Sequence, residues 1–246
     1  MRFSVIIPVW NQLHFSKKLA ECLDADRPGD WEAVWINNGS ADGTGGFLRG
    51  LDGARHRFVE FGENRGFGAA CNAGAAEAEG AYLVFLNNDT EPEPGLLADL
   101  VACLEADPAV GALLPRAAGA VNLSFKRADR RRGVEPMRPF GRIPSGVCVA
   151  MAKSLFFELG CFDLAYGLAS GEDADLFCKV WQAGRHVSMH HGWCLKHVGH
   201  GTTPLLPGRS ELFRKNRELF NERWGKLKSE AKKRRLAEKR SRRKRR

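Results

Sequence analysis

The sequence contains no apolar run long enough to cross a lipid bilayer, and none of its cysteines forms a Cys-x-x-Cys pair. Its seven cysteines are odd in number and scattered, which argues against a disulfide framework and favours reduced, mostly buried thiols. The N-terminal apolar run 3–9 lacks a small-residue cleavage site, so it predicts a first strand and not a signal peptide. We therefore expect a cytoplasmic protein.

The positive charge of the chain is concentrated at its C-terminus. The 246 residues carry a formal net charge of +9, but residues 226–246 contain 13 Lys or Arg and 2 Glu, which is +11. The first 225 residues therefore carry −2 in total. This tail is either solvated and disordered, bound to an anionic membrane surface, or bound to nucleic-acid phosphates. Because it lacks interleaved aromatic residues, we expect no specific nucleic-acid partner.

Strands and helices alternate in the first half of the chain. Apolar runs predict strands at 3–9, 31–36, 57–61, 82–86 and 110–114, and helical spacing predicts helices at 15–23, 44–51, 69–78 and 94–106. This alternation with short loops predicts an α/β fold with a mostly parallel, doubly wound sheet. Because residues 82–86 are all apolar, we expect that strand to be buried on both faces.

The second half of the chain is less regular. Residues 116–142 are rich in arginine and contain Pro136 and Pro139, which predicts a long loop or lid. Order resumes with a strand at 147–151, helices at 153–159 and 171–183, short strands at 187–189 and 193–198, and a helix at 210–224. The basic tail either extends that last helix or is disordered.

Polar side chains follow at least three predicted strands where each strand ends. The strand 82–86 runs directly into Asn87, Asn88, Asp89 and Thr90. In an open α/β sheet, ligands bind beyond the carboxyl ends of the strands, and a carboxylate there can hold a divalent cation that grips a diphosphate. Asn and Asp also make good turns, so this cluster alone leaves a site and a simple turn equally open.

The order of five motifs resembles that of inverting glycosyltransferases of family 2, in the style of the bacterial rhamnosyltransferase-like members. The motifs are VIIPVWN at 5–11, NNGSADGT at 37–44, ENRGFG at 63–68, LNND at 86–89 and GEDADL at 171–176, with a later histidine at His197. The resemblance spans about residues 3–203. It implies a GT-A fold of 1–225, with a nucleotide-binding half at 1–114 and an acceptor-binding half at 115–225, followed by the basic tail 226–246.

The resemblance also implies roles for individual residues. A nucleotide-diphosphate sugar, linked to UDP or dTDP, would contact Pro8, Val9, Trp10, Asn11, Asn37, Asn64, Arg65, Gly66 and Asn88. Asn37 stands where the family usually has an aspartate that accepts a hydrogen bond from the base, and Asn can still accept through its carbonyl oxygen. Asn87 and Asp89 occupy the ends of the family's D-x-D motif. The metal, Mg²⁺ or Mn²⁺, would be held by Asp89 with His197.

The same resemblance implies how the reaction proceeds. Asp173 would be the catalytic base that takes the proton of an acceptor hydroxyl, and Glu172 would bind or orient that acceptor, a glycan or a lipid-linked glycan. The expected activity is inverting transfer of a hexosyl or deoxyhexosyl group, as in cell-surface polysaccharide biosynthesis. Peripheral contact of the tail with the inner face of an anionic plasma membrane would suit a lipid-linked acceptor.

Several alternatives remain at this point. Asp173 can be a helix-capping acid, because acidic residues are favoured in a first helical turn. The run that includes His190, His191, Cys194, His197 and His200 suggests zinc, but its spacing matches no common closed site. The loop at Gly66 and Gly68 follows the third strand, which disfavours a nicotinamide cofactor. Finally, the chain can be an inactive binding protein that keeps only the fold.

Overall fold

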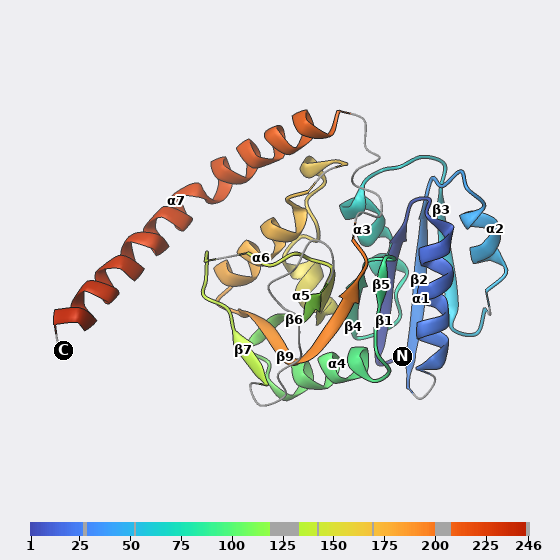
Figure 1. Cartoon of the computed structure of the whole chain (residues 1–246), viewed down its shortest axis with the longest axis horizontal. Coiled ribbons are helices and arrows are strands. Elements are labelled where there is room, and N and C mark those ends of the chain that lie inside the picture. The colour runs from blue at the N-terminus through green and yellow to red at the C-terminus, as the bar shows by residue number, and fades with distance from the viewer. Residues whose placement is uncertain are drawn as a thin grey trace.

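The computed structural model describes residues 1–26, 29–51, 53–118, 133–141, 143–168, 170–199 and 208–244. Its elements are β1 (Phe3–Val9), α1 (Leu13–Ala25), β2 (Trp31–Asn38), α2 (Thr44–Arg49), β3 (His56–Phe61), α3 (Phe67–Glu77), β4 (Tyr82–Leu86), β5 (Thr90–Glu91), α4 (Leu96–Ala106), β6 (Val110–Ala118), β7 (Val134–Pro136), β8 (Cys148–Ala152), α5 (Lys153–Glu158), the 3-10 turn η1 (Leu164–Tyr166), α6 (Glu172–Gln182), β9 (His186–His197) and α7 (Arg209–Lys244). Figure 1 shows these elements arranged as one central sheet flanked by helices.

The sheet is mostly parallel, as the alternation of elements predicts. Its strand order is β3-β2-β1-β4-β8-β6-β9-β5, and β7 pairs with β9. The first four strands of this order pair in parallel, β8 is antiparallel to both of its neighbours, and β6 is again parallel to β9. The carboxyl ends of β1, β2 and β4 therefore lie at one edge of the sheet, where the polar motifs follow.

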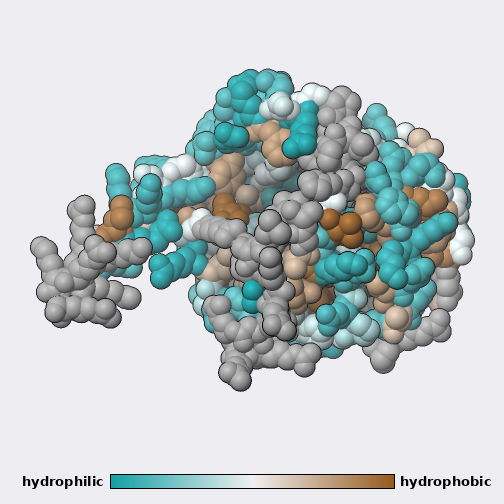
Figure 2. All heavy atoms as spheres, in the orientation of Figure 1, coloured by the Kyte–Doolittle hydropathy of each residue, from teal (hydrophilic) through white to brown (hydrophobic). Residues whose placement is uncertain are grey.

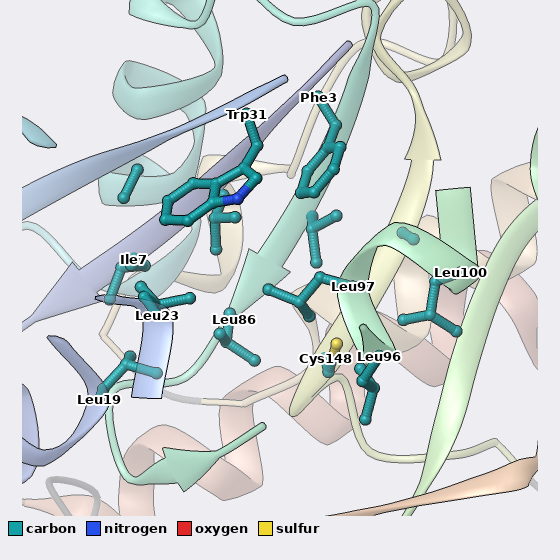
Figure 3. Packing of buried hydrophobic residues seen from close by; sticks show 14 of the residues in the cluster. Phe3, Ile7, Leu19, Leu23, Trp31, Leu86, Leu96, Leu97, Leu100 and Cys148 are labelled. Carbon is teal, nitrogen blue, oxygen red and sulfur yellow. The ribbon is translucent and has the colours of Figure 1, made fainter. Parts of the chain in front are cut away.

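Helices cover both faces of the sheet. Side chains from α1, α2 and α4 pack on one face, and side chains from α3, α5, α6 and the first part of α7 pack on the other. Figure 3 shows the first of these cores, with Leu19 and Leu23 from α1 and Leu96, Leu97 and Leu100 from α4 gathered around Ile7 and Leu86. Strand β4 contributes alternate residues to the two cores, so the prediction that it is buried on both faces is confirmed.

Three predicted boundaries were wrong. The two short strands predicted at 187–189 and 193–198 form one strand, β9, whose register against β6 shifts between Pro115 and Arg116. Pro115 is opposite His190 and Arg116 is opposite Cys194, so β9 is three residues longer than β6 across this shift. Such an irregularity does not end the strand, and local pattern does not reveal it. Strand β6 continues to Ala118, and β7 lies inside the predicted loop 116–142. Residues 119–132 and 142 of that loop lie outside the described residues.

The last helix continues into the basic tail. Helix α7 has 36 residues and passes through Gly225 without a break, so the first of the two alternatives for the tail holds as far as Lys244. Figure 1 shows its C-terminal end extending beyond the body of the molecule, and Figure 2 shows mostly hydrophilic side chains on the coloured part of this extension. Among the described residues, no helix combines the length and hydrophobicity needed to cross a bilayer. The division of the chain into domains stays a prediction.

Candidate active site

The loops that follow β1 and β2 are joined by hydrogen bonds at the carboxyl edge of the sheet. The backbone N–H of Asn11 donates to Ser40 Oγ at 2.8 Å, and the N–H of Ala41 donates to Asn11 Oδ1 at 2.8 Å. Asn11 adopts a left-handed conformation with φ of 57°, which asparagine tolerates better than most residues. A cavity of about 500 Å³ opens beside this loop, lined by Asn11, Gln12, Leu13, His14, Lys17 and Asp42. The predicted nucleoside loop is therefore held in place by its neighbour.

Asn37, the predicted base contact, is buried near the end of β2 with 2% exposure. Its Oδ1 accepts a hydrogen bond from Ser40 N at 3.1 Å, and its Nδ2 donates to Glu60 Oε1 on the adjacent strand at 3.2 Å. These two bonds set the orientation of the amide. The side-chain carbonyl of Asn37 therefore faces the loop after β2, whose Ser40 and Ala41 also form the hydrogen bonds to Asn11.

Asn38 points to the opposite face of the sheet, because successive side chains in a strand alternate. Its Nδ2 donates to Asn64 Oδ1 at 2.9 Å, and its Oδ1 accepts from the backbone N–H of Arg65 at 2.9 Å. Asn38 thereby fixes the loop of Asn64, Arg65 and Gly66. Sequence reasoning placed Asn38 in a motif without giving it a role, although its position next to Asn37 on a strand already required it to face the other side.

Asp89 and His197 meet where β4 ends. Asp89 Oδ2 lies 3.2 Å from His197 Nε2, and the two side chains are 7% and 10% exposed. They meet because β5 pairs with β9, with Thr90 opposite His197, although the two residues are 108 positions apart in the sequence. Asn88 turns away from this pair, toward α1, where its Nδ2 donates to Ser16 Oγ at 3.3 Å.

The surroundings of the Asp89 and His197 pair fit a divalent cation. Within the described residues, Asn87 Oδ1 and His197 Nδ1 are buried atoms without a hydrogen-bond partner. A carboxylate, an amide oxygen and an imidazole are all ligands that Mn²⁺ accepts, and oxygen ligands suit Mg²⁺. A buried polar atom without a partner is costly, and Asn87 Oδ1, two residues from Asp89, is such an oxygen, which an ion would satisfy. An ion shared by Asp89 Oδ2 and His197 Nε2 would take the place of their direct contact.

A second group of metal-ligating residues lies elsewhere on the sheet. Asp99, Cys103 and His190 bring one ligand atom each to within 4.8 Å of one another. Among the described residues, this is the one group of three or more His, Cys, Asp or Glu side chains that lie this close together. His190 Nδ1 accepts from Gly192 N at 3.1 Å, so the ring proton is on Nε2, which faces Asp99 Oδ2 at 3.1 Å. In this tautomer the only nitrogen lone pair, on Nδ1, is occupied by the Gly192 N–H and is not free for a metal. The group is therefore a hydrogen-bonded cluster in this structure.

Glu172 and Asp173 begin α6. Asp173 Oδ2 accepts a hydrogen bond from the backbone N–H of Gly146 at 2.9 Å, and Oδ1 accepts from its neighbour Ala174 at 2.7 Å. A Cβ on Gly146 would lie 2.8 Å from Asp173 Cβ, so only glycine permits this approach. The contact lies outside the motifs that the sequence presents, and no pattern around Gly146 signals it.

Burial raises the pKa values of both carboxyl groups, and their different surroundings make the two shifts differ. Burial and, to a smaller extent, the charge of the adjacent Asp173 together raise the pKa of Glu172 to about 8. Glu172 Oε2 is enclosed and has no hydrogen-bond partner among the described residues. Burial also raises the pKa of Asp173, but backbone N–H groups of Gly146 and Ala174 stabilise its ionised form and oppose that shift. At neutral pH the raised pKa favours a protonated Glu172, and the N–H groups of Gly146 and Ala174 stabilise the ionised form of Asp173 against the effect of burial.

The sequence matches a known protein family over most of its N-terminal part. The family described as Glycosyl transferase family 2 matches residues 4–156, which is more than half of the chain. The chain belongs to glycosyltransferase family 2. This confirms the family resemblance inferred from the five motifs, and the matched region contains the loops of Asn11, Asn37, Gly66 and Asp89.

Curated relatives of this family 2 glycosyltransferase share less than half of the chain. Glycosyltransferase GlyA of Streptococcus pneumoniae is 30% identical over 115 residues, which is 45% of this chain and 16% of GlyA. Dodecaprenyl-phosphate galacturonate synthase of Rhizobium johnstonii is 29% identical over 111 residues, which is 43% of this chain and 33% of the synthase. The chain thus spans a third or less of the length of these relatives.

Solved structures confirm the GT-A architecture. The crystal structure of S. aureus TarS 1-349 superposes with a TM-score of 0.68 at 17% identity, covering 89% of this chain and 64% of that one. The mannosyltransferase PcManGT from Pyrobaculum calidifontis, in complex with GDP-Man and Mn²⁺, superposes with a TM-score of 0.65 at 22% identity, covering 83% of this chain and 59% of that one. At these identities the likeness establishes the fold.

Proposed function

We propose that this family 2 glycosyltransferase transfers a sugar from a nucleotide-diphosphate donor to an acceptor hydroxyl, with inversion at the anomeric carbon. The observation that carries the proposal is the buried pair of Asp89 and His197 at the carboxyl end of β4, at the sheet edge where the Asn11 and Asn37 loops are joined. Buried ionisable groups placed together at such an edge are costly for folding and favour a functional role.

The donor is proposed to lie along the edge formed by these loops. Trp10 and Asn11 would contact the nucleoside, and Arg65, whose loop is fixed by Asn38, would contact the diphosphate. Asp89 and His197 would hold Mg²⁺ or Mn²⁺, which when bound offsets the charge of the departing diphosphate. The related structures of TarS with UDP or UDP-GlcNAc and of PcManGT with GDP-Man and Mn²⁺ support a donor of this class.

Proton transfer is assigned to the start of α6. As the acceptor oxygen bonds to the anomeric carbon, the bond to the diphosphate breaks, and Asp173 takes the hydroxyl proton. The hydrogen bond from Gly146 orients the Asp173 carboxylate for this step. Glu172, protonated at neutral pH because of its raised pKa, would donate a hydrogen bond to the acceptor and hold it in place.

The acceptor is proposed to be a glycan or a lipid-linked glycan, and the basic end of α7 is proposed to contact an anionic membrane surface. Residues 226–246 carry +11, and each Lys or Arg close to an anionic leaflet adds about 1 kcal/mol to binding. The similarity to a dodecaprenyl-phosphate galacturonate synthase supports a lipid-associated acceptor. A role in cell-surface polysaccharide synthesis on the cytoplasmic side of the membrane is part of the same proposal.

Calorimetry of nucleotide binding tests the donor site first. UDP, dTDP, GDP and ADP would be titrated with and without Mn²⁺ into the wild-type chain and into the Asp89→Asn and Asp173→Asn variants. We expect Mn²⁺-dependent binding of one nucleotide, at least about tenfold weaker binding by Asp89→Asn, and unchanged binding by Asp173→Asn.

The two variants are then compared for sugar transfer or donor hydrolysis. Removing the base should lower turnover by about 100-fold or more while the nucleotide still binds. If the wild-type chain bound none of the four nucleotides, the proposal would be wrong, and the inactive binding protein would be the better description. If Asp173→Asn turned over donor at the wild-type rate, Asp173 would not be the base.

A further inference from the structure

Helix α7 contacts the elements that hold Asp173, although its residues lie more than 30 positions downstream in the sequence. We infer that Trp224 of α7 is a positioning residue for the catalytic carboxylate. The inference rests on the proposed function of Asp173 and adds a role for a part of the chain that the five motifs do not reach. Three sets of contacts support it.

The first contact joins α7 to α6. Trp224 Nε1 donates to Asp175 Oδ1 at 2.8 Å, and Asp175 is only 1% exposed. Tyr166 OH donates to the same oxygen at 3.2 Å, and Lys179 Nζ lies 3.1 Å from Oδ2. A buried carboxylate depends on such donors, so Trp224 is one of the groups that hold Asp175 where it is. Asp175 lies in the same first turn of α6 as Asp173.

The second contact joins α7 to the segment that leads to Gly146. The ring of Phe140 lies 6.3 Å from the ring of Trp224 and 5.6 Å from the ring of Trp181 in α6. Phe140 lies six residues before Gly146, whose N–H donates to Asp173 Oδ2. Trp224 therefore contacts two elements, the helix that carries the Asp173 carboxylate and the segment that carries the Gly146 N–H donor. These two elements are joined by the hydrogen bond that orients Asp173.

The third contact holds the loop that enters α6. Asn216 Nδ2 donates to Tyr166 O at 2.7 Å and to Ser170 O at 2.8 Å. About two turns before Trp224, the same helix thus binds the backbone of two residues, Tyr166 and Ser170, shortly before the start of α6. Because turnover falls steeply when a reacting group is misplaced by about 1 Å, loosening these contacts should affect the reaction more than the binding of the donor.

The test compares two tryptophans that make the same kind of bond. Trp224→Phe keeps an aromatic ring against Phe140 but loses the N–H to Asp175. The matched control is Trp193→Phe, because Trp193 Nε1 donates to Asp99 Oδ2 at 2.6 Å, on the other core. Asp175→Asn is a second variant that keeps the side-chain shape. Circular dichroism and thermal melting establish that each variant is folded.

Two measurements decide the outcome. With Mn²⁺ and UDP-glucose, UDP-N-acetylglucosamine, dTDP-rhamnose or GDP-mannose, we expect Trp224→Phe to lower kcat for donor turnover on the order of 10-fold, with KM and nucleotide Kd unchanged. Hydrogen exchange should be faster at the amide of Gly146 in Trp224→Phe and unchanged in Trp193→Phe. A variant that merely lost stability would not show this division between kcat and KM.

The outcomes separate this inference from the proposed function. Wild-type turnover with equal kcat in Trp224→Phe and the control would overturn the positioning role and leave the proposed function intact. Absence of wild-type turnover with all four donors would count against the proposed function. In that case unchanged exchange at Gly146 in both Trp224→Phe and Asp175→Asn would still refute the positioning role, and faster exchange would support it.

Discussion

Substitution of Gly66 by alanine tests the close approach between the predicted nucleotide loop and the loop that leads to α6. Gly66 has φ of 91° and ψ of 163°, a region that essentially only glycine occupies. A Cβ at this position would overlap the carbonyl oxygen of Gly167 and lie 3.0 Å from its carbonyl carbon. Both partners are backbone atoms, so neither can move aside by a change of rotamer.

Two terms contribute to the expected loss of stability. The backbone conformation costs about 1–3 kcal/mol for a residue with a side chain. Relieving the overlap shifts one backbone segment, which typically costs a further ~1–3 kcal/mol. Gly160 provides the control, because its φ is 77° but a Cβ there would meet nothing within 4 Å. Gly160→Ala should therefore show only the conformational cost, about 1–2 kcal/mol.

Calorimetric melting and nucleotide titration measure the two effects. In a protein of this size 1 kcal/mol corresponds to about 2–4 °C, so the overlap should lower the Tm of Gly66→Ala by about 2–12 °C beyond that of Gly160→Ala. Nucleotide affinity should fall only in Gly66→Ala, because the displaced loop carries Asn64 and Arg65. Equal Tm values for the two variants would refute the argument that the Gly167 carbonyl excludes a side chain.

Two further predictions concern the acidic pair and the tail. Burial raises the pKa of Glu172 from 4.5 to about 8, so its contribution to stability is fully present below about pH 4.5 and is lost as the pH rises through 8. Denaturant titrations should therefore show that Glu172→Gln removes a decline on the order of 2–4 kcal/mol between about pH 5 and pH 9; an unchanged decline would show that another group causes it. Deleting residues 226–246 should release the protein from anionic vesicles in sedimentation, with wild-type binding weakened by salt, whereas unchanged partitioning would contradict membrane contact by the tail.

Much of the fold could be predicted from the sequence because its signals are local. The apolar runs of β1, β2 and β4 and the polar or glycine-rich segments after them indicated both the parallel sheet and the edge where a ligand would bind. Strand β9 was predicted less well. The sequence pattern predicts two short strands with a gap between them. Only the pairing with β6 shows that the chain stays extended across this gap, with a shift in register.

The sequence by itself determined which chemical groups are available, namely Asp89 and His197, proposed to hold a cation, Asp173 and Glu172, proposed as base and acceptor contact, and a tail of charge +11. The tertiary structure decided which of them act together. Strand pairing brings His197 to 3.2 Å from Asp89, and the N–H of Gly146 reaches Asp173 from a separate segment. Helix α7 braces that segment and α6 through Trp224. Such contacts join residues far apart in the chain, and their geometry depends on packing that no local pattern encodes.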